Sequence, residues 1–192
     1  GESEIPNGNG NKRDLGMQTA LFVARTIHND LTLVNASSWS WWTALTRADY
    51  KDGLVYLDDG TNNGSQVTDY CKKDGFARDS KLMWMLGNYS FFVRPGMKRV
   101  AVITENPDPE KEGKDVMISA YKDGSSKKIV LVAVNVGSVN RKYNLQDLKL
   151  KNQTLIPYTT SETSNLGKGA AIKANEIIVP AKSVVTFVGE LE

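Results

Sequence analysis

The sequence has very little of the chemistry that builds metal centres and nucleophilic triads. Its 192 residues hold one cysteine, Cys71, and one histidine, His28. A single cysteine excludes an intramolecular disulfide and a cysteine-based metal cluster. A single histidine excludes a His-rich zinc site and disfavours a Ser-His-Asp triad. We therefore expect no metal and no cofactor in this chain.

Long apolar runs and one-sided charge are also missing. No stretch approaches the roughly 18 apolar residues that are needed to cross a bilayer. No secretory signal opens the chain, and the first residues, Gly1 to Glu4, resemble a cut edge. The formal net charge is +2, with acidic and basic residues interspersed. These patterns predict neither membrane insertion nor a nucleic-acid partner.

The first half of the sequence alternates helical patterns with turn-rich loops. Apolar residues recur at a period near 3.6 from Leu15 to Leu31, which predicts an amphipathic helix. The segment Leu33 to Trp42 is short and apolar enough to predict a buried strand, and Leu54 to Leu57 indicates a second short one. A helix is predicted from Ser80 to Val93 and is ended by Pro95-Gly96. A unit with one clear strand cannot form its own parallel sheet, so we expect this half to belong to something larger.

The second half alternates apolar and polar residues in short runs, with Asp123-Gly124 as a hairpin turn. About seven such strands at this spacing predict an antiparallel β-sandwich. The predicted strands are Arg99 to Thr104, Val116 to Tyr121, Ile129 to Val136, Arg141 to Leu145, Gln153 to Thr159, Glu176 to Val179 and Ser183 to Gly189. The change in pattern predicts two domains, residues 1–94 and residues 95–192.

Three of the four tryptophans, Trp39, Trp41 and Trp42, lie within four residues. Core packing alone rarely concentrates tryptophan in this way, because each buried indole N–H needs a hydrogen-bond partner. A helix followed by a strand with aromatic residues at its exit is how α/β barrels build a sugar-binding floor. The alternative is that all three rings are core residues.

The acidic residues do not form an obvious catalytic pair. None lies inside an apolar strand end, where its position and pKa could be controlled. Asp58-Asp59-Gly60 is typical of a turn, and Asp30 is expected at the surface near the end of the first helix. His28 and Cys71 are interpreted as a structural residue and a bystander. The carboxylates considered are Glu2, Glu4, Asp30, Asp49, Asp52, Asp58 and Asp59.

Several segments, in order, together resemble glycoside hydrolase family 30. The subgroup that the chain resembles most is the endo-β-1,6-galactanase type, with glucosylceramidases and glucuronoxylanases as more distant relatives. The resemblance covers nearly the whole chain. It is carried by Arg13 to Met17, Ala20 to Leu31, Asn35 to Ala44, Leu86 to Gly96, Pro157 to Glu162 and Val179 to Val188.

The resemblance implies a carboxy-terminal portion of a retaining enzyme, with a (β/α)8 barrel followed by an antiparallel β-sandwich. This chain would hold a helix, the last strand and the last helix of that barrel. Family members carry an acid/base glutamate after the fourth barrel strand and a nucleophile at the end of the seventh. Glu4 follows a serine, but Ile5-Pro6-Asn7 departs from the family motif, so the nucleophile is expected just upstream of Gly1. No catalytic residue is therefore assigned to this chain.

Trp39 and Trp42 match family tryptophans at the end of the eighth strand, one of which lines a sugar subsite. Trp41 has no consistent match, but we keep it as a candidate. The intact parent is thus expected to be an extracellular or periplasmic enzyme that hydrolyses a β-linked glycan, with β-1,6-galactan as one candidate. The partners expected of this chain are a β-linked oligo- or polysaccharide and the remainder of the parent barrel.

A second hypothesis is a non-catalytic β-sandwich module that binds carbohydrate or only supports structure. The sandwich half has few aromatic residues, Tyr121, Tyr143, Tyr158 and Phe187, which favours support. The barrel half is expected to expose apolar residues, Val23 and Ile27 among them, and to self-associate through them.

Overall fold

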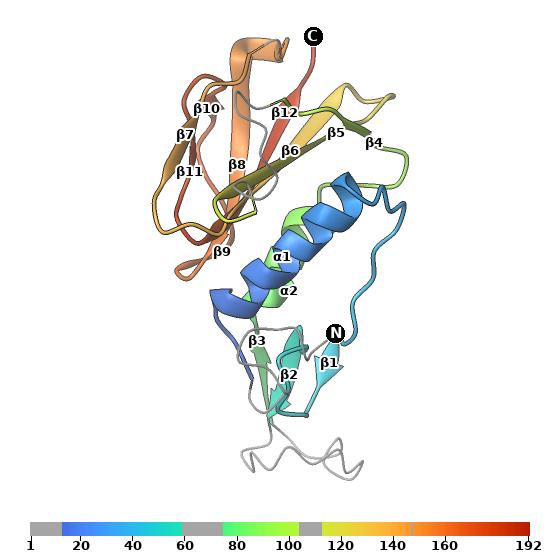
Figure 1. The fold of residues 1–192 in the computed structure, drawn as a ribbon, viewed down its shortest axis with the longest axis vertical. Helices are drawn as coiled ribbons and strands as arrows, with labels where there is room; N and C mark the ends of the chain where they lie inside the picture. Colours follow the sequence, from blue (N-terminus) through green and yellow to red (C-terminus); the bar gives the residue numbers. More distant parts are fainter. Residues whose placement is uncertain (1–12, 59–74, 104–112, 147) are drawn as a thin grey trace.

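The computed structural model describes residues 13–58, 75–103, 113–146 and 148–192. Two helices lie side by side against one face of a large antiparallel sheet, and a small two-stranded sheet lies on the other side (Figure 1). A separate three-stranded sheet lies at the far end of the helices. The helices are α1 (Met17–Thr32) and α2 (Lys81–Ser90), with a short 3-10 turn at Lys151–Gln153.

The three sheets differ in size and direction. The three-stranded sheet runs β1-β2-β3, with β1 and β2 parallel, and the two-stranded sheet pairs β11 with β7. The large sheet runs β10-β8-β12-β6-β5-β4, with β9 paired to β8. The strands are β1 (Leu45–Thr46), β2 (Val55–Asp58), β3 (Phe76–Asp79), β4 (Lys98–Val100), β5 (Val116–Lys122), β6 (Lys128–Asn135), β7 (Arg141–Tyr143), β8 (Thr154–Ser161), β9 (Ser164–Lys168), β10 (Ile172–Lys173), β11 (Ile177–Val179) and β12 (Ser183–Glu190).

Helix α1 confirms the predicted helix to within two residues at either end. The Asp14 carboxylate caps it, accepting hydrogen bonds from the backbone N–H of Gly16 at 2.8 Å and of Thr19 at 2.7 Å. Val23 and Ile27 are 2% and 1% exposed in the apolar cluster that joins the helices to the sheet. The expectation that they face neighbours outside this chain is therefore wrong, because the large sheet itself covers them.

The central strand β6 is buried on both faces. Its even-numbered residues, Val130, Val132 and Val134, belong to the cluster under the helices. Leu131 and Ala133 point the other way, into the cluster that includes Ile177 and Val179 of β11. A strand between two apolar layers reads as a continuous apolar run, as this one does. The predicted β-sandwich is thus confirmed as two apolar layers on the two faces of the large sheet.

Buried hydrogen bonds fasten α2 to the sheet. The Asn88 side-chain amide donates to the Tyr158 carbonyl and to the Thr186 hydroxyl, both at 3.0 Å. The Thr186 hydroxyl in turn donates to the Asn88 carbonyl at 2.7 Å. Asn88 and Thr186 are both fully buried, so these bonds replace water and fix the helix in register with β8 and β12.

Most predicted strands of the second half are confirmed, including the β5–β6 hairpin. Hydrogen bonds from Ser126 and Ser125 lower the pKa of Asp123, which lies in the turn of this hairpin, to about 2.

The strand predicted from Leu33 to Trp42 is wrong, since this segment is a loop between α1 and β1. No strand among the described residues pairs with this segment, and Asn35 turns the chain with a φ of 56°.

The first half also forms more sheet than expected. β2 pairs with β1 and with β3, two strands that the sequence did not reveal. β1 has only two residues, and all of β3 is exposed, so neither shows apolar alternation.

The division of the chain into two domains at residue 94 stays a prediction, and one apolar cluster joins residues from both parts. No helix among the described residues has the length and apolar character of a membrane span.

Candidate functional site

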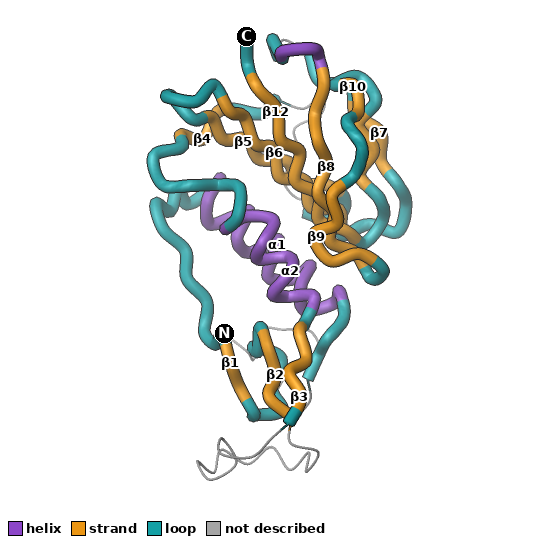
Figure 2. Tube along the Cα trace, turned by 180° about the vertical axis from the view of Figure 1, so that it is seen from behind, coloured by secondary structure: helices purple, strands orange, loops and turns teal. Residues whose placement is uncertain are grey.

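The aromatic loop, residues 33–44, runs from the end of α1 along the side of the helices to β1 (Figure 2). It leaves the helix through three backbone hydrogen bonds, two to the Asn29 carbonyl and one to the Asp30 carbonyl. The Arg99 guanidinium of β4 donates to the Asn35 side-chain carbonyl at 2.6 Å. The loop is therefore held at its start by both the helix and the large sheet.

Trp39 and Trp41 are stacked on one another on the inner side of the loop. Their ring centroids are 5.7 Å apart, and their planes are within 7° of parallel. The Trp39 indole N–H donates to the Asp30 carboxylate at 2.9 Å, and that of Trp41 donates to the Asp52 carbonyl at 2.7 Å. Both rings pack against the cluster under the helices. They anchor the loop, so the interpretation as core residues describes this pair.

Trp42 is placed differently from the other two. Its side chain is 81% exposed, whereas the rings of Trp39 and Trp41 are half-buried. The three candidate tryptophans therefore do not form one surface: two lie against the protein, and one faces solvent. An exposed indole face next to a fixed loop is suited to stacking on the C–H face of a sugar ring.

The Asp52-Gly53 turn supports the aromatic loop through its contact with Trp41. Tyr56 of β2 is fully buried, accepts a hydrogen bond from the Gly53 N–H at 3.1 Å and donates to the Tyr50 carbonyl. Burial raises the pKa of the Tyr56 hydroxyl to about 12, so it stays a donor at neutral pH. The Arg13 guanidinium lies 5.0 Å from the centroid of the same ring. Trp41 thus rests on a turn that a buried tyrosine holds in shape.

Replacing Gly53 by alanine should destabilise this support. A Cβ atom there would lie 2.6 Å from both the Thr46 methyl and Cζ of Tyr56, which is closer than packed carbon atoms approach. Overpacking of this kind costs about 1–3 kcal/mol in the free energy of unfolding. Gly124→Ala is the matched control, because nothing lies within 4 Å of its added methyl group. Urea unfolding of both variants checks this, and equal midpoints would contradict it.

His28 lies inside the molecule, as the structural interpretation requires. It is 8% exposed, and burial, followed by the charge of Arg99, lowers its pKa to about 4. The neutral ring sits on α1 two residues before Asp30, the residue that holds Trp39. No group of three or more candidate metal ligands occurs among the described residues.

The described carboxylates among the catalytic candidates are paired with neighbouring groups or buried in the fold. Asp49 pairs with Arg13 at 2.6 Å, and the Asp52 side chain is buried beneath the loop. Asp30, expected at the surface, instead accepts the Trp39 hydrogen bond. In the sequence, the only indication of this contact is that Asp30 lies shortly before the tryptophans. The fold shows that the Asp30 and Trp39 side chains meet. Glu2, Glu4, Asp59 and Cys71 lie outside the described residues, as does the side chain of Asp58.

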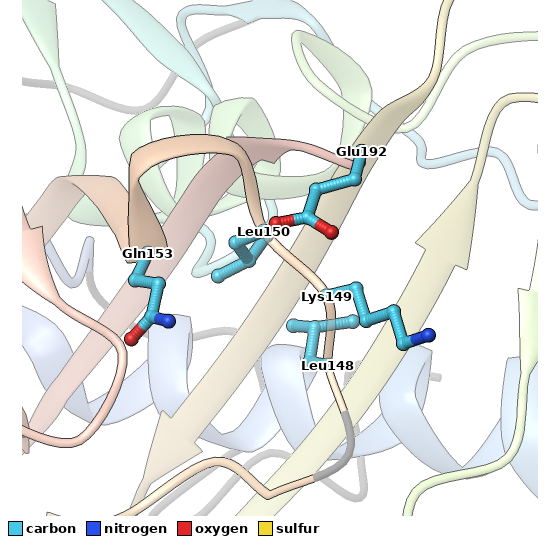
Figure 3. Close-up of a pocket in the computed structure, with 5 residues that line it drawn as sticks. All are labelled: Leu148, Lys149, Leu150, Gln153 and Glu192. Atoms are coloured by element: carbon cyan, nitrogen blue, oxygen red, sulfur yellow. The ribbon is translucent and has the colours of Figure 1, made fainter.

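A cleft of about 590 Å³ lies where residues near the start of β8 meet the end of the chain beyond β12 (Figure 3). It is lined by Leu148, Lys149, Leu150, Gln153 and Glu192. Leu150 there is 1% exposed and belongs to the core. The lining contains no aromatic residue and one carboxylate side chain, so the aromatic loop remains the better candidate.

Comparison of the chain with known proteins points to one family. The family model for O-glycosyl hydrolase family 30 matches residues 2–56, which include the whole aromatic loop. Glucuronoxylanase XynC of Bacillus subtilis is 30% identical over 193 residues that cover 97% of this chain. These matches support recognition of the chain as part of a glycoside hydrolase family 30 protein. The chain corresponds to the carboxy-terminal portion of the family's proteins.

Solved structures of family 30 and of an exported protein have a similar fold. A conserved exported protein from Bacteroides fragilis is 37% identical with a TM-score of 0.78, covering 90% of this chain and 33% of that one. A family 30 endoxylanase from Clostridium papyrosolvens is 25% identical with a TM-score of 0.63, covering 93% of this chain and 41% of that one. The chain spans 38% of the length of the curated relative.

Proposed function

We propose that this chain supplies part of the sugar-binding surface, and a supporting sandwich, to a retaining family 30 glycoside hydrolase that acts on a β-linked glycan. The observation that carries the proposal is the exposed ring of Trp42 on a loop that Trp39 and Trp41 anchor. An aromatic platform on a rigid support stacks on a pyranose ring without losing much conformational freedom on binding. The proposal extends to secretion of the parent, and a similar structure is described as an exported protein.

Xylan is the substrate class that we propose in place of β-1,6-galactan. The curated relative is named a glucuronoxylanase, and the endoxylanase is a family 30 structure at 25% identity. Neither of these two relatives is named for β-1,6-galactan, so they do not support that expectation. Both substrates are β-linked chains of pyranose rings, and a stacking platform serves either.

The remainder of the parent barrel is the proposed macromolecular partner. The loop and β1 expose apolar side chains at the two ends of this segment: Leu33, Val34 and Leu45 are 63%, 71% and 62% exposed. β1 lies at the edge of its sheet and pairs with β2 in parallel, as strands of an α/β barrel do. This arrangement supports the proposal that the helices, the loop and β1 form part of a barrel.

A purely supportive role fits the sandwich better than glycan binding does. Two of its four aromatic residues, Tyr121 and Phe187, are 4% and 2% exposed. Tyr158 is half-buried, with its ring centroid 4.5 Å from that of Phe92. Binding by aromatic stacking needs exposed rings. These residues therefore give little support to the alternative of a sandwich that binds glycan in this way.

We expect the purified chain alone to show no glycosidase activity. A retaining mechanism needs an acid/base and a nucleophilic carboxylate about 5–5.5 Å apart. From the family resemblance we expect neither of these carboxylates within this chain. Assays against xylan, β-1,6-galactan and aryl β-glycosides check this, with the parent's longer reading frame as the positive control. Turnover that survives repurification and is lost in Glu4→Gln would contradict the expectation.

A further inference from the structure

A groove of about 810 Å³ lies between the first turns of α1 and the ends of β6, β8 and β12 in the large sheet. Its floor is formed by Met17, Leu21, Phe22 and Val136, of which Met17 and Leu21 are buried and the other two half-buried. Phe22 precedes Asp30, the anchor of Trp39, by eight residues, or about 12 Å along the helix. None of the residues that line the groove belongs to the aromatic loop, residues 33–44.

The rim of the groove carries two cations and two carboxylates. Arg25 lies 5.6 Å from the centroid of the Phe22 ring, and the Lys182 ammonium donates to the Val136 carbonyl at 2.6 Å. Asp14 caps α1, and the Glu162 carboxylate reaches to within about 3.6 Å of where a Cβ on Gly16 would lie. The formal charges of these four groups sum to zero, so the rim has no net charge to favour an ionic ligand.

Donors and acceptors around an apolar floor, with no net charge, suit a neutral polyhydroxylated ligand. The apolar floor can contact the C–H face of a sugar ring, while guanidinium, ammonium, carboxylate and the Gln18 amide can bind its hydroxyl groups. The volume lies in the range of pockets that enclose small ligands, about 300–1,000 Å³. We propose that this groove is a second glycan-binding site, which takes a neutral β-linked oligosaccharide.

This inference rests on the proposed function, because the glycan is that of the proposed parent. The two sites would act together: a chain held in the groove raises the local concentration of glycan near the aromatic loop. Phe22 and Arg25 would bind, and Glu162 would orient, a segment of the polymer that is not being cleaved.

The test is a titration of the isotope-labelled chain with xylohexaose, followed by backbone amide shifts. We expect shifts at residues 17–25 that saturate with one dissociation constant. Gln18→Trp should abolish them, because Gln18 is exposed at the groove and an indole there would fill it. Phe22→Leu, which keeps the apolar volume, and Arg25→Ala should each weaken binding about tenfold. Lys122→Trp, on an exposed site of β5, is the matched control and should change nothing.

The outcomes separate this inference from the proposed function. Shifts that persist in Gln18→Trp, or that are absent from residues 17–25, would overturn the groove and leave the Trp42 surface standing. Shifts at residues 17–25 that remain in Trp42→Ala, together with a Trp42 signal that does not respond in the unchanged chain, would support the groove and count against the aromatic loop. Shifts that follow protein dilution without sugar would mean a second copy occupies the groove, and tighter binding of a uronic acid-substituted oligosaccharide would contradict the neutral ligand.

Discussion

Replacing Phe187 by alanine should lower the free energy of unfolding by about 3–5 kcal/mol. Phe187 is 2% exposed in β12, between β6 and β8, and fills the cluster between the large sheet and β11. Truncation removes the ring and leaves a cavity that two flanking strands cannot close. At the usual slope for a chain of this length, the melting temperature should fall by roughly 10 °C.

Phe91→Ala is the matched control for this substitution. Phe91 follows the end of α2 and is 69% exposed, with an edge contact to Phe92 at a centroid distance of 5.1 Å. Its loss should cost about 1 kcal/mol or less. Chemical denaturation followed by circular dichroism measures both variants. Similar losses for the two phenylalanines would show that the sheet does not form the core described above.

Acid should destabilise the fold through His28. The pKa of this ring is lowered from 6.5 to about 4, chiefly by burial and then by Arg99. Between these values the unfolded chain binds a proton that the folded chain does not, so stability falls as the pH drops from about 6.5 to about 4. The shift of about 2.5 pH units corresponds to a loss of up to about 3 kcal/mol over that window. Above pH 6.5 this contribution to the pH dependence is absent.

His28→Gln isolates the effect, because the chain has no other histidine. The variant should show a flatter stability profile between pH 4 and pH 6.5, while carboxylates such as Asp123 still titrate below that range. A direct measurement of the His28 pKa by NMR should give a value well under 6. An identical slope in the variant, or a His28 pKa near 6.5, would show that the ring is solvated.

The sequence pattern predicted the parts of the fold that bury regular apolar faces. The 3.6-residue period located α1 and α2, and the alternating runs located β5, β6, β8 and β12 to within two residues. Edge strands such as β3 and β9 escaped, because exposed strands do not need an apolar face. The Leu33 to Trp42 segment failed for the opposite reason: its apolar residues suggest burial, but in this chain the first two face solvent.

The candidate site was predictable as a location and not as an arrangement. The tryptophan cluster marked the loop, but spacing did not show that Trp39 and Trp41 would face inward and Trp42 outward. That difference depends on Asp30 and on the Asp52 carbonyl, whose approach to the two indoles is a tertiary contact. Trp41, which lacks a counterpart in the family resemblance, thereby acquires a structural role beside Trp39.

The direct test of the sugar platform is the indole N–H spectrum of the labelled chain during titration with xylohexaose. The chain has four tryptophans, and a Trp42→Phe variant assigns the one resonance that matters. We expect the Trp42 signal to shift progressively with added sugar, while those of Trp39 and Trp41 stay in place because their N–H groups are bonded within the protein. A Trp42 signal that does not move at saturating oligosaccharide, or one that moves less than the anchored pair, would contradict the account.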